Sequence, residues 1–315
     1  MKKLLFLLLL FCVPGGNLFA QNSASGPNSN NSQSQDDQSR IQVHVELVNV
    51  LTTVTDKKNR LVTNLTKDDF RIFEDDKPQD IRFFSRETDL PLRIGILIDT
   101  SNSIRERLSF EQDAAIDFLN AAVRPGKDLA FVETFDMEPQ LIQDYTDDME
   151  KLSNAIRGVK AGGVTSLYDA VFSSCKDKML IFPPPEPYLR RVQIIISDGQ
   201  DNKSVHTQDE ALSMAERAEV TIYAISTNRS GSEGRGDKAL HKLADGTGGH
   251  AFLPFEAGDL AADFEEIGHE LRSQYSLAYV SSNAAHDGTF RQITVKPVNK
   301  NLNVRAKAGY FALSP

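Results

Sequence analysis

The stretch LRIGILIDTSNSIRE, residues 92–106, decides how the rest of the chain is interpreted. An apolar run ends at Asp99, and Ser101 and Ser103 follow almost at once. Such a run, without polar alternation, predicts a strand that is buried on both faces. The polar residues after it then lie where the strand gives way to a helix. At that point they either cap the helix or contribute oxygen atoms to a binding site.

Similar apolar runs recur as far as residue 274, separated by patterns typical of amphipathic helices. The runs are IGILID, DLAFVETF, RRVQIIISD, VTIYAIS and GHAFLPF. Two helical faces are formed by Ile104, Leu108, Ala115, Leu119 and Ala122 and by Leu260, Phe264, Ile267 and Leu271. This alternation predicts an α/β fold, doubly wound, with a mainly parallel sheet covered on both sides. QLIQDYT follows DLAFVETF after a short turn, which predicts one antiparallel edge strand.

Two β-rich segments without a helical period flank this α/β region. The first, residues 41–90, contains IQVHVELVNV and then DDFRIFEDDKPQDIRFFSRE, which predicts two short strands around a Pro-containing turn. The second, residues 275–315, contains YSLAYVSS, FRQITVKPV and LNVRAKAGYFAL. We expect the two segments to pair in one small β domain, into which an α/β domain of residues 91–274 is inserted.

The N-terminus has the pattern of a bacterial signal peptide. Residues 1–20 begin with two lysines, continue with a short apolar run and end on Ala20. Residues 21–40 are almost wholly Ser, Asn, Gln, Asp and Gly, which predicts a disordered tether. No later segment is long and apolar enough to cross a bilayer. We therefore expect an exported protein, periplasmic or secreted, without a membrane span after signal removal.

The charge and cysteine content limit the possible partners and cross-links. Removal of residues 1–20 leaves 33 of the 35 basic residues against 44 acidic ones, a net charge of −11. An acidic chain argues against nucleic-acid binding, which requires positive charge to displace counterions. Cys175 is then the single remaining cysteine, so an intramolecular disulfide is excluded. Its helical register with Leu167 and Val171 predicts a buried thiol.

Two further loops are expected at the same edge of the sheet as Asp99. GGVTSLYDA, residues 162–170, places Thr165 before a helix, and ISDGQDN, residues 196–202, places Asp198 directly after a strand. Binding sites of parallel sheets lie outside the carboxyl ends of the strands. The sequence therefore predicts a metal site formed by Asp99, Ser101, Ser103, Thr165 and Asp198.

This set of residues suits a hard divalent cation such as Mg²⁺, with Mn²⁺ or Ca²⁺ as alternatives. Two carboxylates neutralise the ion, and hydroxyl groups add oxygen ligands without adding charge. The site would retain an open position and no surplus negative charge. We expect a carboxylate from a partner protein to fill that position.

The pattern resembles the metal-ion-dependent adhesion site of von Willebrand factor type A domains, a family that includes the integrin inserted domains. The family's D-x-S-x-S motif corresponds to Asp99 through Ser103, and its threonine and later aspartate correspond to Thr165 and Asp198. The flanking segments are similar to those of an exported bacterial subgroup of this family. The resemblance implies direct metal contacts from Ser101, Ser103 and Thr165, and contacts partly through water from both aspartates. It also implies a protein-binding, adhesion-type function.

Two other functions remain open at this stage. An aspartate at a strand end is also found in Mg²⁺-dependent phosphotransferases and hydrolases, although Ser101 occupies the position where those enzymes usually carry a second aspartate. The sequence contains no lysine-bearing phosphate loop and no G-x-S-x-G elbow, so we expect no catalytic residues. The second alternative is a structural envelope protein that does not use the metal for binding.

Overall fold

The computed structural model describes residues 47–86, 90–102, 105–180, 189–228, 230, 232–254 and 257–314. The predicted signal peptide and tether, residues 41–46, Ser103 and Ile104 lie outside the described residues. Val45–Pro315 form one compact unit. None of the helices in the described ranges combines the length and apolar character that a bilayer span requires.

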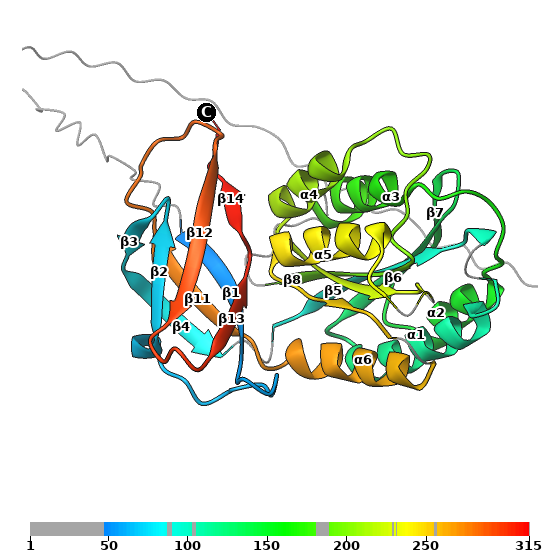
Figure 1. Cartoon of the computed structure of the whole chain (residues 1–315), viewed down its shortest axis with the longest axis horizontal. Helices are drawn as coiled ribbons and strands as arrows, with labels where there is room; N and C mark the ends of the chain where they lie inside the picture. The colour runs from blue at the N-terminus through cyan, green and yellow to red at the C-terminus, as the bar shows by residue number, and fades with distance from the viewer. Residues whose placement is uncertain are drawn as a thin grey trace, which may run out of the picture. The chain divides into compact units, whose positions relative to one another are not determined.

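A six-stranded sheet forms the centre of the α/β region (Figure 1). Five strands run parallel, and the sixth lies antiparallel at one edge. In spatial order the strands are β10 (Ala251–Phe252), β9 (Val220–Ser226), β8 (Arg190–Ser197), β5 (Leu92–Asp99), β6 (Leu129–Phe135) and β7 (Pro139–Thr146). The antiparallel edge strand is β7, which contains the predicted QLIQDYT.

Helices cover both faces of this sheet, as Figure 1 shows. One face packs against α1 (Leu108–Ala122), α2 (Met149–Gly158) and α6 (Ala257–Glu270). The other face packs against α3 (Leu167–Ser174), its π-helical continuation η3 (Cys175–Leu180), α4 (Gln208–Arg217) and α5 (Arg235–Thr247). The predicted fold class, a doubly wound and mainly parallel α/β sheet, is confirmed.

The central strand β5 is buried along its whole length, which explains its unbroken apolar sequence. Ile94, Ile96 and Ile98 belong to the core under α1, whereas Leu97 belongs to the core under α3. A Cβ atom at Gly95 would lie 2.5 Å from the ring of Phe131 on β6. Glycine at this position therefore makes room for an aromatic ring between neighbouring strands.

The flanking segments form a second region of two four-stranded antiparallel sheets. One sheet has the order β13 (Asn303–Ala306), β1 (Leu47–Thr55), β11 (Tyr275–Val280) and β4 (Ile81–Arg86). The other has the order β14 (Gly309–Phe311), β12 (Phe290–Pro297), β2 (Phe70–Glu74) and β3 (Lys77–Gln79). Side chains from both sheets share one hydrophobic core, which includes Val50, Leu277, Ile72 and Ile293. We call this region the β sandwich.

The local structure around Pro78 differs from the sequence prediction. The structure has three strands here instead of two, after a short 3₁₀ helix η1 (Lys67–Asp69). The turn is formed by Asp75 and Asp76, whose φ angles of 46° and 63° suit aspartate better than most residues. Pro78 itself lies in β3, an edge strand where a missing N–H group is tolerated. β4 then pairs with β11 in the other sheet.

A buried polar network joins the α/β region to the sandwich at the end of α6. The carboxylate of Glu270, the last residue of α6, accepts hydrogen bonds from Thr53 Oγ1 (2.7 Å), Tyr223 OH (2.8 Å) and Arg305 Nη2 (2.5 Å). Gln274 Nε2 donates a further bond to Thr53 Oγ1 (3.0 Å). Glu270 is fully buried, so each of its partners offsets part of the cost of burying its charge.

Candidate metal site

The candidate metal site lies at the carboxyl ends of β5 and β8. Asp99 is the last residue of β5, and Asp198 directly follows the last residue of β8. The two strands are parallel neighbours, with Ile98 opposite Ile196, so both aspartates emerge at the same edge of the sheet. Asp99 is fully buried, whereas Asp198 is partly exposed.

The carboxyl group of Asp99 is held by residues on both sides. Oδ1 accepts a hydrogen bond from the backbone N–H of Ser101 (2.8 Å), and Oδ2 accepts one from the hydroxyl of Ser197 (2.7 Å). Burial raises the pKa of Asp99 to about 6. The hydrogen bonds from Ser197 and Ser101 work against this rise, while the negative charge of Asp198 adds to it. The site therefore contains a carboxylate that a cation would stabilise.

Backbone hydrogen bonds tie the three predicted loops together. The N–H of Gly162, in the loop before Thr165, donates to the carbonyl oxygen of Thr100 (2.6 Å). The N–H of Asn202, in the loop after Asp198, donates to the carbonyl oxygen of Thr165 (3.0 Å). The loop of Thr165 is thus bonded to the loops of both aspartates.

The turn after Asp198 requires glycine. Gly199 has a φ angle of 73°, and a Cβ atom there would lie 2.2 Å from the carbonyl oxygen of Gly236 on α5. Asp198 Oδ1 accepts a hydrogen bond from the N–H of Gln200 (3.0 Å), which fixes the carboxylate over the turn. The close contact of two glycine backbones therefore sets the path of this loop.

Of the five predicted ligands, the structure describes four and brings their loops to one edge. Ser103 lies outside the described residues, so its contribution stays a prediction. Thr165 is 3% exposed, and among the described residues its hydroxyl makes no hydrogen bond. A hydroxyl without a hydrogen-bond partner, in a loop bonded to the loops of both aspartates, fits an oxygen-coordinated cation. Asp99, Ser101, Thr165 and Asp198 are the described residues that could hold it.

In the described parts of the chain, no group of three or more His, Cys, Asp or Glu side chains is placed to hold a metal ion. His206 instead contacts the carboxylate of Asp169 (2.7 Å) and stacks on Phe172 (3.8 Å between ring centroids). Cys175 is fully buried, and burial raises the pKa of its thiol. The chemistry available at the edge of the sheet is therefore that of oxygen ligands.

Two residues near the site were missed by the sequence analysis. Ser197 is the last residue of β8, and its hydroxyl both donates to Asp99 and accepts from the N–H of Gly199 (3.0 Å). Nothing in its sequence context distinguishes it from any polar residue at the end of a strand.

Glu111 is the second residue that was missed. It lies on α1, is 1% exposed, and neither carboxylate oxygen has a hydrogen-bond partner among the described residues. Burial raises its pKa to about 7, Arg107 at 4.0 Å lowers it, and the charges of Asp99 and Asp198 raise it further. Its register with Leu108 and Ala115 on the apolar face of the helix was the signal that could have identified it.

Residues 94–200 match the family model of the von Willebrand factor type A domain. The match covers 107 of the 315 residues, and the doubly wound sheet observed there is consistent with the fold of this family. The matched range is shorter than the 91–274 predicted for the domain. A comparison with curated protein sequences found no match.

Similar solved structures come from several sources. A von Willebrand factor type A protein from Catenulispora acidiphila is 13% identical with a TM-score of 0.50, over 78% of this chain and 74% of its own. BatB from Bacteroides thetaiotaomicron is 14% identical with a TM-score of 0.47, over 58% of this chain and 100% of its own. Proximal thread matrix protein 1 from the mussel byssus, solved with a zinc-occupied MIDAS motif, is 18% identical with a TM-score of 0.49. That likeness covers 63% of this chain and 49% of the mussel protein.

Proposed function

We propose that the protein is an exported, metal-dependent protein-binding module and not an enzyme. A divalent cation, Mg²⁺ or alternatively Mn²⁺ or Ca²⁺, would be held by Asp99, Ser101, Ser103, Thr165 and Asp198. The observation that carries the proposal is the joining of three loops at one sheet edge, with a buried carboxyl group and an unpaired hydroxyl among them. The cation would supply a positive charge that binds a carboxylate of a partner protein.

The residues of the site would divide this task between them. Ser197 and the N–H of Ser101 orient the carboxylate of Asp99, so its position is fixed before a cation binds. Thr165 contributes a hydroxyl without adding negative charge, and Asp198 contributes the second carboxylate. This division keeps the net charge of a loaded site near zero, so no surplus negative charge would repel an anionic group from the open position of the cation.

The surface beside Asp198 supports binding to an acidic partner. A hollow of about 580 Å³ is lined by Asp198, Asn228 and Arg235, among others. It also contains the carboxylate of Asp201, which already accepts a hydrogen bond from the N–H of Tyr168 (3.0 Å). Arg235 is exposed at the start of α5, where its guanidinium group is available to a carboxylate. The partner is therefore proposed to present an acidic segment, one carboxylate at the cation and another at Arg235.

The proposed location is outside the cytoplasm of a bacterium, in the periplasm or the medium. The support is the N-terminal sequence, with its basic start, short apolar run and Ser/Asn/Gln-rich continuation. Nucleic acid is not a proposed partner because the chain is acidic.

Calorimetric titration of Mg²⁺ and Mn²⁺ into the protein tests the proposal. A Thr165→Ala, Asp198→Ala double variant removes two ligands, and circular dichroism checks that it is folded. Asp287→Ala, Thr289→Ala is the matched control, because it removes the same residue types from an exposed loop of the β sandwich.

Saturable binding by the native protein and the control, lost in the first variant, supports the metal site. Equal heats of metal binding in all three proteins would contradict the proposed metal site. They would favour the alternative of a structural envelope protein that does not use a metal for binding. Turnover of phosphate esters that disappears in Asp99→Asn would instead favour the hydrolase alternative.

A further inference from the structure

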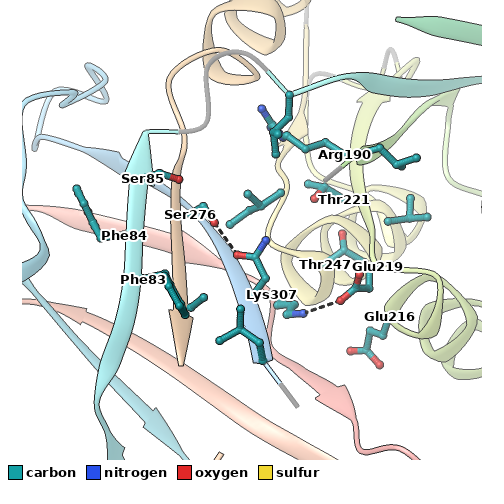
Figure 2. Close-up of a pocket in the computed structure, with 17 residues that line it drawn as sticks. Phe83, Phe84, Ser85, Arg190, Glu216, Glu219, Thr221, Thr247, Ser276 and Lys307 are labelled. Atoms are coloured by element: carbon teal, nitrogen blue, oxygen red, sulfur yellow. Dashed lines mark hydrogen bonds and ion pairs between the residues drawn. The ribbon is translucent and has the colours of Figure 1, made fainter. Parts of the chain in front are cut away.

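A pocket of about 670 Å³ lies between the β sandwich and the amino-terminal edge of the parallel sheet (Figure 2). Its lining includes Arg190 and Val220, the first residues of β8 and β9. The candidate metal site lies at the opposite, carboxyl ends of these strands. The pocket is therefore separate from the metal site, and its volume is in the range of small-molecule sites, which often lie between domains.

One wall of the pocket is the outer face of the sheet that contains β1, β11 and β4. Two rows of cross-strand neighbours form it: Phe83, Ala278 and Asn49 in one row, and Ser85, Ser276 and Leu51 in the next. Asn49 and Ser276 bond to each other (2.7 Å) and so satisfy part of their polar capacity within the wall. Phe83 is 63% exposed, a large apolar surface that an occupant of the pocket would cover.

The positive charges that line the pocket are already engaged. Lys307 Nζ pairs with the carboxylate of Glu219 (3.6 Å), as the dashed line in Figure 2 shows. The guanidinium group of Arg190 donates to the carbonyl oxygen of Leu271 and to Oε1 of Gln274. An anionic ligand would have to compete with these partners.

Glu216 differs from the other charged side chains of the lining, each of which has an ion-pair or hydrogen-bond partner. Within the described residues its carboxylate has no hydrogen bond and no ion pair. Burial raises its pKa to about 7, and Lys307 and Arg217 only partly oppose this effect. Arg217 is held elsewhere, with its guanidinium carbon 3.7 Å from the centre of the Phe311 ring. The pocket thus combines a partly apolar wall with one carboxyl group that has no partner among the described residues.

We propose that this pocket binds a small amphipathic ligand that carries an apolar, flat body and one protonated amine. The body would lie over Phe83, Ala278 and Leu51, and the amine would pair with Glu216. Burial of the apolar body provides affinity, and the amine provides the charge that Glu216 lacks. The proposal is independent of the metal site.

Fluorescence titration with tryptamine tests this proposal directly. The protein contains no tryptophan, so the emission of the indole ring can be followed without tryptophan emission from the protein. Tryptophol and indole-3-propionate have the same ring with a neutral and a negative end. We expect tryptamine to bind about tenfold more tightly than tryptophol, and indole-3-propionate to bind least.

Three variants, each checked for folding by circular dichroism, assign the binding to this pocket. Glu216→Gln should remove the preference for tryptamine over tryptophol and keep the weaker binding of the ring. Phe83→Ala should weaken both ligands. Glu150→Gln, at an exposed position on α2, is the matched control and should leave both affinities unchanged.

Absence of saturable tryptamine binding in the native protein would overturn the proposal. So would equal or tighter binding of indole-3-propionate, or a preference for tryptamine that persists in Glu216→Gln. Repeating the titration in the presence of a chelator separates this result from the proposed metal site, because binding at the pocket should not change.

Discussion

The hydroxyl of Ser197 donates a hydrogen bond to Oδ2 of Asp99 across the boundary between β8 and β5 (2.7 Å). Ser197 also accepts the N–H of Gly199, so a single side chain connects the candidate ligand of one strand with the turn that follows the other. The carboxyl ends of β5 and β8 are therefore connected by hydrogen bonds between protein groups alone.

Ser197→Ala should weaken metal binding while the fold is retained. The variant removes a donor from a fully buried carboxyl group, which costs about 1–3 kcal/mol of stability. Loss of an orienting partner typically lowers metal affinity about tenfold or more. Calorimetry with Mg²⁺ measures the affinity, and Ser314→Ala, at an exposed C-terminal position, is the control. An unchanged affinity would show that Ser197 does not position Asp99.

Metal binding should weaken as the pH falls through the pKa of Asp99. Burial raises this pKa to about 6, so protons and cations compete for the same carboxylate near that pH. We expect Mg²⁺ affinity to be several-fold lower at about pH 5.5 than at about pH 7.5. Calorimetric titration at the two values measures the ratio. A pH-independent affinity would mean that Asp99 is not a ligand.

Glu111 should make the metal-free protein less stable at neutral than at acidic pH. Its folded pKa of about 7 lies above the ordinary value of 4.5, so the folded state retains a proton that the unfolded state releases. The contribution of Glu111 to stability is then largest below about pH 4.5 and is lost as the pH rises through 7, by at most about 3 kcal/mol.

Glu111→Gln should reduce this fall, as measured by urea unfolding at about pH 5 and 7.5 in the presence of a chelator. Glu150→Gln, at an exposed position on α2, is the control and should behave as the native protein does. The same pH dependence in Glu111→Gln as in the native protein would assign the effect to other buried carboxyl groups.

Glu270→Ala should destabilise the protein strongly. It leaves Thr53, Tyr223 and Arg305 without their shared acceptor at the join between the α/β region and the sandwich. Removing one member of a buried ionic network costs about 3–5 kcal/mol. Chemical denaturation measures the loss, and Glu265→Ala on the exposed side of the same helix should cost less than about 0.5 kcal/mol.

The α/β fold could be predicted because its strands and helices carry their own periodicity. On β5, Ile94, Ile96 and Ile98 face one layer of helices, and Leu97 faces the other. A strand that is buried on both faces has an unbroken apolar sequence, which is visible without the structure. The candidate ligands could be predicted because strand ends of a parallel sheet meet at one edge.

Other features depend on contacts that sequence patterns do not specify. The hydrogen bond of Ser197 to Asp99 joins residues 98 positions apart, and its existence depends on strand order. The division of β3 and β4 between two sheets likewise depends on partners, β2 and β11, at different places in the chain. Local patterns identify strands, whereas pairing is decided by the whole domain.

The pairing of β1 with β11 has a consequence for synthesis of the chain. β1 ends at Thr55 and its partner begins at Tyr275, so the ribosome adds about 220 residues before β1 can pair with β11. The α/β region has all its strands by then and can fold while β1 still presents open backbone N–H and C=O groups. Until β11 and β13 emerge, that strand needs protection from pairing with other chains, and a premature stop before Tyr275 would leave it without either partner.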